Sequence, residues 1–291
     1  MGVVGSAGRA ALSEARDGPS AGRGRADVAD LLSAASGLIC RTRRWEDALY
    51  DSLTMRNFAG IDLGREPAPD ETTVCKFRHL LERHGLSRKL LKQGNGYLER
   101  HGLKIGTGTI VDATLIEAPS STKNKSGERD PEMHQVRKGK QWYFGMKARV
   151  RVDAETKLIH SVASTAANVA DSRMLAGLLH GEKTEVWGDQ AYQGQAEVIQ
   201  QRAPKAADRI DRRWRTKLHE YPEVREENRI KSKARSRVEY VFAVIKLRFG
   251  FTKSVIAGLV KNLHRLLSTC ALANLYTATK HMLAVPAQSR A

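Results

Sequence analysis

The sequence predicts an α/β protein in which helices flank a mixed β-sheet and a small helical domain precedes it. Three observations predict this class. Apolar residues recur at helical spacing before residue 101, and β-branched segments alternate with helical patterns after Gly102. The chain has 291 residues, of which 41% are hydrophobic and 28% charged. These values are near the average of globular proteins and exclude a wholly disordered or collagen-like chain.

The first residues do not share this pattern. Residues 1–26 are rich in Gly, Ala, Ser and Arg without periodic order, and a short helical pattern begins near Val28. We expect residues 1–44 to be an atypical leader, either disordered or altered in reading frame.

Residues 45–101 are predicted to be a helical DNA-binding segment, because short helices with basic faces commonly form DNA-binding domains. A helical cap whose basic face is only solvated fits the same pattern. The expected elements are a helix Trp45–Phe58 stopped by Gly60, a helix Val74–His84 with its N-cap at Thr72 and Thr73, and a helix Ser87–Arg100.

Residues 102–283 are predicted to form one α/β domain, followed by a C-terminal tail, 284–291. Its segments alternate between strand and helix patterns. The expected elements are a strand Thr107–Ala118, a polar loop Ser120–Gly139, a hairpin of Trp142–Val152 and Leu158–Ala163, a helix Asp171–His180, a strand Glu185–Gly188, a helix Gln195–Arg202, a long helix Glu223–Phe249, and one or two helices in Val260–Leu283.

The charge balance indicates a polyanionic partner. There are 49 Lys and Arg against 32 Asp and Glu, a net charge of +17. Such a protein commonly binds DNA, RNA or an acidic membrane surface, although a ribosomal-type protein has the same composition. No segment has the roughly 18 consecutive apolar residues of a membrane span, and three scattered cysteines without a CxxC pair indicate a reducing compartment.

Three acidic residues stand in unusual places. Asp112 lies inside the apolar β pattern Thr109–Leu115, where a carboxylate is costly to bury unless it is paired or binds a metal. Asp189 ends the strand Val186–Asp189, and acids at the carboxyl ends of neighbouring strands can converge. Glu239 lies on the long helix. Singly, each residue fits a structural role better than a catalytic one, and only the joint pattern indicates a site for divalent metal ions.

One stripe of the long helix combines charges of both signs. At 100° per residue, Arg235, Glu239 and Lys246 lie within 40° of one another. The stripe fits a metal ligand flanked by two cations, and it also fits an ordinary surface ion pair four residues apart.

The chain resembles bacterial insertion-sequence transposases of the DDE type, close to the insertion-sequence-five family. Together the matching stretches are highly specific and cover most of residues 45–283. They are Trp45–Leu86, Gly108–Pro119 (GTIVDATLIEAP), Lys123–Val152, Thr165–Asp171 (TAANVAD), Val186–Gly194 (VWGDQAYQG) and Arg235–Gly250.

The resemblance implies a ribonuclease-H-like catalytic domain that holds two Mg²⁺ ions, for which Mn²⁺ can substitute. It implies that Asp112, Asp189 and Glu239 are the catalytic, metal-binding triad. The signature of the family around its glutamate places a Tyr, an Arg and a Lys in fixed register. Arg235 and Lys246 match that register, whereas the Tyr position is Ser232. Residues 1–44 resemble no part of the family. A shifted reading frame or a wrong start upstream of Trp45 would produce such a segment.

The implied function is DNA transposition. The enzyme would cleave double-stranded DNA at the inverted-repeat ends of its element and join them to target DNA, as a homodimer in the bacterial cytoplasm, associated with the nucleoid and without a membrane partner. Two alternatives stay open: an inactive DNA-binding remnant and a nuclease that cuts without joining. A ribosomal-type RNA-binding protein does not explain an acid within an apolar strand.

Several residues are candidates for DNA contact. Arg235 and Lys246 would grip a phosphate near the scissile bond, or else orient Glu239 through ion pairs. Tyr192 would touch DNA or pack locally. We expect Trp142 and Tyr143 to pack in the core rather than to stack on bases. The loop after the first strand carries the remaining candidates, for which a solvated loop is the alternative: Lys123, Lys125, Arg137, Lys138 and Lys140.

Overall fold

The computed structural model describes residues 42–103, 108–125, 127–179, 183–212 and 222–284. It divides into two compact units, Met1–His84 and Gly85–Ala291. The predicted boundary at residues 101 and 102 therefore falls inside the second unit. The helical pattern near Val28 and nearly all of the predicted leader lie outside the described residues.

The first unit contains three described helices, and their ends differ from the prediction. The expected single helix Trp45–Phe58 is two helices, because Ser52 leaves helical geometry and its hydroxyl accepts a hydrogen bond from the Met55 amide at 3.3 Å. The third helix is capped by Asp70, not by Thr72 or Thr73. The helices are α3 (Thr42–Asp51), α4 (Leu53–Ala59) and α5 (Glu71–Arg83). Their buried core is Leu49, Met55, Ala68 and Val74.

The second unit is built on one mixed sheet. Its central strand β1 runs antiparallel to β3 on one side and parallel to β5 on the other, and β6 continues the sheet parallel to β5. The far edge of β3 pairs first with β2 and then with β4. The strands are β1 (Gly108–Glu117), β2 (His134–Lys138), β3 (Gln141–Asp153), β4 (Ile159–Ala166), β5 (Glu185–Gly188) and β6 (Ala207–Ile210). The predicted loop Ser120–Gly139 thus contains a strand, and β6 was not predicted.

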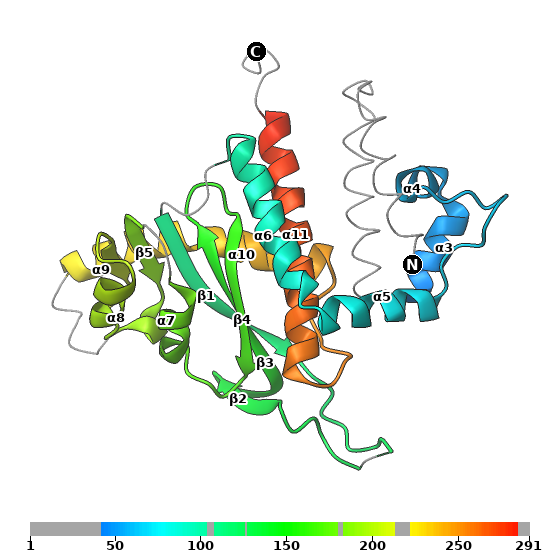
Figure 1. Cartoon of the computed structure of the whole chain (residues 1–291). Coiled ribbons are helices and arrows are strands. Elements are labelled where there is room, and N and C mark those ends of the chain that lie inside the picture. Colours follow the sequence, from blue (N-terminus) through cyan, green and yellow to red (C-terminus); the bar gives the residue numbers. More distant parts are fainter. Residues whose placement is uncertain (1–41, 104–107, 126, 180–182, 213–221, 285–291) are drawn as a thin grey trace. The chain divides into compact units, whose positions relative to one another are not determined.

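Helices cover both faces of this sheet, which confirms the predicted ribonuclease-H-like α/β class (Figure 1). Helices α7 and α8 lie on one face and α10 on the other, while α6 and α11 run side by side next to β4. The helical segments are α6 (Leu86–Arg100), η1 (Ser172–Met174), α7 (Leu175–Leu178), η2 (Gln190–Tyr192), α8 (Ala196–Arg202), α9 (Pro222–Arg235), α10 (Arg237–Ala243), the π-helix η4 (Val244–Arg248) and α11 (Leu259–Ala284).

The helical segment expected at Glu223–Phe249 is therefore not continuous. Ser236 separates α9 from α10, and the last turn before Phe249 is a π-helix. A uniform rotation of 100° per residue does not hold across these irregularities. The predicted single stripe of Arg235, Glu239 and Lys246 is accordingly broken.

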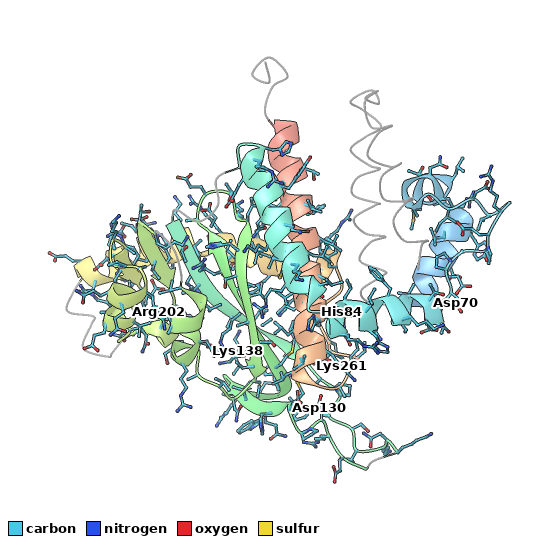
Figure 2. All side chains as sticks on the ribbon, in the orientation of Figure 1. Asp70, His84, Asp130, Lys138, Arg202 and Lys261 are labelled. Carbon is cyan, nitrogen blue, oxygen red and sulfur yellow. The ribbon has the colours of Figure 1, made fainter. Side chains whose placement is uncertain are left out.

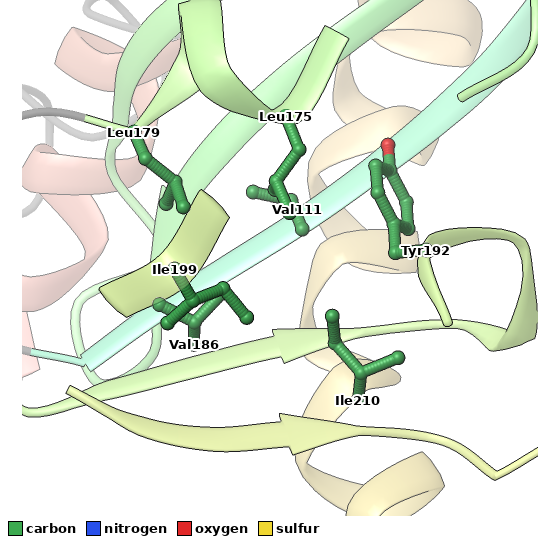
Figure 3. Close-up of a cluster of buried hydrophobic side chains, with 7 residues drawn as sticks. All are labelled: Val111, Leu175, Leu179, Val186, Tyr192, Ile199 and Ile210. Atoms are coloured by element: carbon green, nitrogen blue, oxygen red, sulfur yellow. The ribbon is translucent and has the colours of Figure 1, made fainter. Parts of the chain in front are cut away.

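The core under α7 and α8 is a cluster of buried apolar side chains from three strands and the adjoining helices (Figure 3). Its members are Val111, Leu175, Leu179, Val186, Tyr192, Ile199 and Ile210. Because side chains alternate along a strand, the cluster places Val111 of β1 on the α7 face and the next residue, Asp112, on the opposite face. Core packing thus fixes the direction of Asp112.

A second buried connection joins α6, α11 and β4. The Asn274 side chain accepts a hydrogen bond from the Ile159 amide at 2.7 Å and donates to the Ile159 carbonyl at 2.6 Å and to the Asn95 side chain at 2.7 Å. Helix α6 therefore belongs structurally with the sheet, although we predicted it as part of the N-terminal helical segment.

Buried charges tie β3 to the chain that follows β4. Arg149 is fully buried, and its Nε donates to Asp171 at 3.0 Å. Lys147 donates to the other oxygen of Asp171, also at 3.0 Å. Asp171 ends the stretch TAANVAD that carries part of the family resemblance, so this stretch has a structural role in the fold.

The long connection between β1 and β2 is fixed at its downstream end. Asp130 accepts a hydrogen bond from the Gly258 amide at 2.7 Å, and Glu132 accepts one from the Leu259 amide. Both carboxylates therefore satisfy amides at the start of α11 (Figure 2 labels Asp130 there). No helix among the described residues is long and apolar enough to cross a membrane.

Candidate active site

Two of the predicted acids lie level with each other on neighbouring parallel strands. Strands β1 and β5 pair up to Ile110 and Trp187, so two residues further along each chain the register brings Asp112 and Asp189 side by side. Asp112 lies in the middle of β1, and Asp189 directly follows β5. The negative charge of Asp189 is one of the causes that raise the pKa of Asp112.

A third acid, which the sequence analysis missed, extends this row. Gly188 pairs with Ile210 on β6, so the following residue, Asp211, lies level with Asp189. The Asp211 amide donates to the Gly188 carbonyl at 3.0 Å and continues the ladder by one rung. The only sequence signal was an acid directly after an apolar residue, which is weak on so short a strand.

Asp112 is a largely buried carboxylate of the row. Its side chain is 15% exposed, one oxygen accepts the Ala113 amide at 2.7 Å, and the other accepts Arg235 Nη1 at 3.3 Å. Burial raises the pKa of Asp112 to about 6, although the Ala113 amide and the Arg235 charge both oppose this. The site therefore stabilises the charged form less well than water does.

Asp189 is positioned by the turn after its strand. One of its oxygens accepts the Ala191 amide at 3.0 Å, so the residue caps the short helix η2. The side chain is half-buried. This cap holds the carboxylate at the end of β5, beside Asp112.

Arg235, at the end of α9, lies between two members of the row. Its Nη1 contacts Asp112, and its Nε lies 3.7 Å from Asp211 Oδ2. The same Asp211 oxygen accepts the Ser232 hydroxyl at 3.3 Å. Burial raises the pKa of Asp211, and Arg235 opposes the rise. Ser232 occupies the position where the family signature has a Tyr, and here it supports a buried carboxylate.

Glu239 does not join this cluster. It is exposed in the first turn of α10, and its carboxylate makes no hydrogen bond or ion pair with any described residue. Within the described ranges, no three acidic, His or Cys side chains are close enough to hold a metal ion. The structure thus brings together two of the three predicted triad residues. Their oxygen donors fit the preference of Mg²⁺ for carboxylates.

Two protein-family models match this chain. A model of the transposase DDE domain matches residues 104–275, more than half of the chain. This chain belongs to the DDE transposase family. A model of a transposase domain (DUF772) matches residues 31–80. Family resemblance therefore begins at residue 31, within the region 1–44 that we expected to resemble no part of the family.

Most of the predicted DNA-contacting cations of this transposase are exposed. Lys123, Lys125, Lys138 and Lys140 are solvent-exposed, and no ion pair involves them among the described residues. Arg137 is also exposed, with its Nε bonded to the Gly139 carbonyl at 3.1 Å. Lys138 lies on the β2–β3 hairpin (Figure 2). The exposed positions leave these charges available to phosphates.

Lys246 has a different setting from Arg235. It is half-buried, and burial lowers its pKa, as does the nearby positive charge of Lys138, whereas Glu117 acts in the opposite direction. The charges that act on Lys246 thus come from Glu117 and Lys138, the last residues of β1 and β2. Arg235 instead contacts Asp112 in the middle of β1. The two cations do not flank Glu239 as one group.

The structure favours local packing over DNA contact for Tyr192, and it places Trp142 and Tyr143 outside the core where we expected them. Tyr192 is 1% exposed and packs in the core cluster, so its ring is not available to DNA (Figure 3). Trp142, which we expected in the core, is 63% exposed on the hairpin. Tyr143, which we also expected there, is half-buried and donates from its hydroxyl to Gln141 at 3.1 Å.

Proposed function

We propose that this transposase catalyses divalent-metal-dependent cleavage of DNA at insertion-sequence ends and joins the freed ends to target DNA. The observation that carries the proposal is the level placement of Asp112 and Asp189 on neighbouring parallel strands, in a chain of the DDE family. The acids stand in a protein of net charge +17, as an enzyme acting on a polyanion requires. We also propose that it belongs to the insertion-sequence-five family.

The reaction needs little covalent chemistry from the protein. Water attacks a phosphodiester at the element end and frees a 3′-hydroxyl, which then attacks a target phosphodiester. Two Mg²⁺ ions, or Mn²⁺ in their place, would activate the attacking oxygen and stabilise the leaving oxygen. Asp112 and Asp189 would hold them from the sheet. Glu239 would complete the ligand set from α10, because its exposed carboxylate is free of other described partners.

The DNA path would follow the exposed cations. Lys123, Lys125, Arg137, Lys138 and Lys140 would contact backbone phosphates on the approach to the acids. We propose that two copies act together on double-stranded DNA, since transposition joins two ends, and that they act in the bacterial cytoplasm, associated with the nucleoid. Exposed Trp142 is available to stack on a base, the interpretation that the sequence analysis disfavoured.

One observation favours a second candidate function. Because Glu239 stands apart from Asp112 and Asp189, the chain is also compatible with a DNA-binding remnant of a transposase that no longer cuts.

Strand cleavage tests both candidates. Purified full-length protein would be incubated with Mg²⁺ and end-labelled duplexes carrying the terminal repeats that flank its gene. We expect nicks at the repeat ends and joined products, and neither with Asp189→Asn. Cleavage without joining would indicate a nuclease. Salt-sensitive DNA binding without cleavage, in protein that melts cooperatively, would overturn the catalytic proposal and support the remnant.

A further inference from the structure

Asp211 is a buried carboxylate that the proposed reaction does not use. It is 5% exposed, and its Oδ1 has no hydrogen-bond partner among the described residues. Its Oδ2 has the Ser232 hydroxyl at 3.3 Å and Arg235 Nε at 3.7 Å. An ionised carboxylate is costly to bury without a partner of opposite charge, so this one depends on Arg235.

The Arg235 guanidinium contacts two carboxylates, one more closely than the other. Its Nη1 hydrogen-bonds Asp112 at 3.3 Å, whereas its Nε, at 3.7 Å from Asp211, is buried without a hydrogen-bond partner. The contact with Asp211 is therefore an ion pair that stops short of a hydrogen bond. A small rotation toward Asp211 would close it.

We propose that Asp211 is a positioning residue that receives Arg235 when Asp112 binds a divalent ion. The guanidinium and the ion compete for Asp112 Oδ2, because both are cationic and need the same lone pairs. Asp211 offers the guanidinium a second acceptor with an unused oxygen. Arg235 then stays at the site, beside the bound ion and in reach of a DNA phosphate, instead of leaving it. This inference rests on the proposed metal site at Asp112 and Asp189.

The proposal predicts how a variant binds metal without DNA. In Asp211→Asn, Arg235 keeps Asp112 as its only carboxylate partner, so we expect Mn²⁺ to bind at least about tenfold more weakly, as is typical when a residue behind a ligand is removed. Asp208→Asn is the matched control. It removes the same charge three residues earlier, at an exposed position of β6 that makes no hydrogen bond or ion pair with Arg235 in the described part of the chain, and should change the Kd less than about twofold.

A spectroscopic signal of Arg235 tests the movement in the unaltered protein. The Nε–H resonance of ¹⁵N-arginine-labelled full-length protein, assigned by its loss in Arg235→Lys, should shift and exchange more slowly with solvent on addition of Mg²⁺. Slower exchange indicates that the Nε–H, which has no acceptor in the described structure, has gained one, and Asp211 Oδ2 is the carboxylate oxygen that it faces. The measurement needs no substitution at Asp211, so it decides the question even where Asp211→Asn fails to fold.

The outcomes separate the two proposals. Mn²⁺ binding that is lost in Asp189→Asn but unchanged in Asp211→Asn overturns the role of Asp211 alone. An Arg235 signal that ignores Mg²⁺ while the ion binds does the same. Absence of Mn²⁺ binding in the unaltered protein, or full binding in Asp189→Asn, contradicts the metal site and with it the inference.

Discussion

At the scale of single residues, the strongest feature is a carboxylate held where its charge is disfavoured. Asp112 is largely buried in the middle of a strand, and its one cationic contact does not offset the loss of water. Such a carboxylate gains most from a cation that can replace hydration entirely. The same residue that weakens the metal-free fold is thus well suited to bind a metal ion.

The raised pKa of Asp112 predicts a pH-dependent stability. Its pKa is about 6 in the folded chain against an ordinary 3.8, so the folded state binds the proton more tightly. The free energy of unfolding should therefore fall as pH rises from about 4 through 6. Asp112→Asn, which mimics the protonated form, should be more stable than the parent by about 3 kcal/mol at pH 7.5 and nearly equal to it near pH 4.

Urea denaturation with EDTA present, at pH 4 and pH 7.5, measures this difference. Asp208→Asn, at an exposed position, serves as the control: it keeps Asp112, so its free energy of unfolding should fall with rising pH as that of the parent does. An Asp112→Asn protein less stable than its parent at pH 7.5 would show that the ion pair with Arg235 outweighs burial.

The sequence revealed Asp112 and Asp189 but not Asp211, for a physical reason. An acid within a long apolar strand is conspicuous, because burial of the strand is visible in its composition. Strand β6 is a short edge strand whose first three residues, Ala207, Asp208 and Arg209, are exposed. It has almost no apolar pattern, so nothing marked the residue that follows it.

At the scale of elements, the connection after β4 depends on a buried charge. Asp171 holds fully buried Arg149 and half-buried Lys147 against the turn that leads into α7. Asp171→Asn removes the compensating charge and leaves the Arg149 guanidinium buried without it. We expect the free energy of unfolding to fall by about 3 kcal/mol.

Chemical denaturation compares this variant with Glu185→Gln, which removes one carboxylate from an ion pair with Arg209 whose side chain is 46% exposed. That control should lose less than about 1 kcal/mol. Equal losses in the two variants would mean that Arg149 finds another partner or water, and that the buried pair does not hold the connection.

Sequence periodicity did not detect the interruptions between α3 and α4 and between α9 and α10. The apolar pattern continues through Ser52, because Leu49 before the break and Met55 after it lie in the same buried core. A single serine that ends one helix and begins the next does not disturb that pattern. The break at Ser236 lies between Arg235, which contacts Asp112 and Asp211, and Glu239, which does not join them.

At the scale of the whole molecule, the charge of +17 predicts binding to DNA of any sequence that weakens steeply with salt. Each lysine that contacts a phosphate adds about one to the slope of log affinity against log salt. Replacing Lys123 and Lys125 by Gln should therefore lower the slope by about two. Fluorescence anisotropy with a random duplex between 50 and 300 mM KCl, roughly the range over which such contacts weaken, measures it.

The matched control replaces Lys89 and Lys92, two exposed lysines of α6, and changes the net charge by the same amount. If both pairs lower the slope equally, then overall charge and not the segment after β1 determines the binding. Composition alone predicted a polyanionic partner, which agrees with a protein of the transposase family. Composition contains no information on which exposed lysines face that partner.

The anchoring of Asp130 and Glu132 to the first amides of α11 has a further consequence for molecular recognition. A long surface segment normally loses conformational entropy when it closes on a ligand, by about 1–2 kcal/mol for each residue that becomes fixed. Here the downstream end of the segment bearing Lys123 and Lys125 is already immobilised on a helix 128 residues away in the chain. Part of that ordering is complete before any DNA arrives, so more of the phosphate attraction remains as affinity.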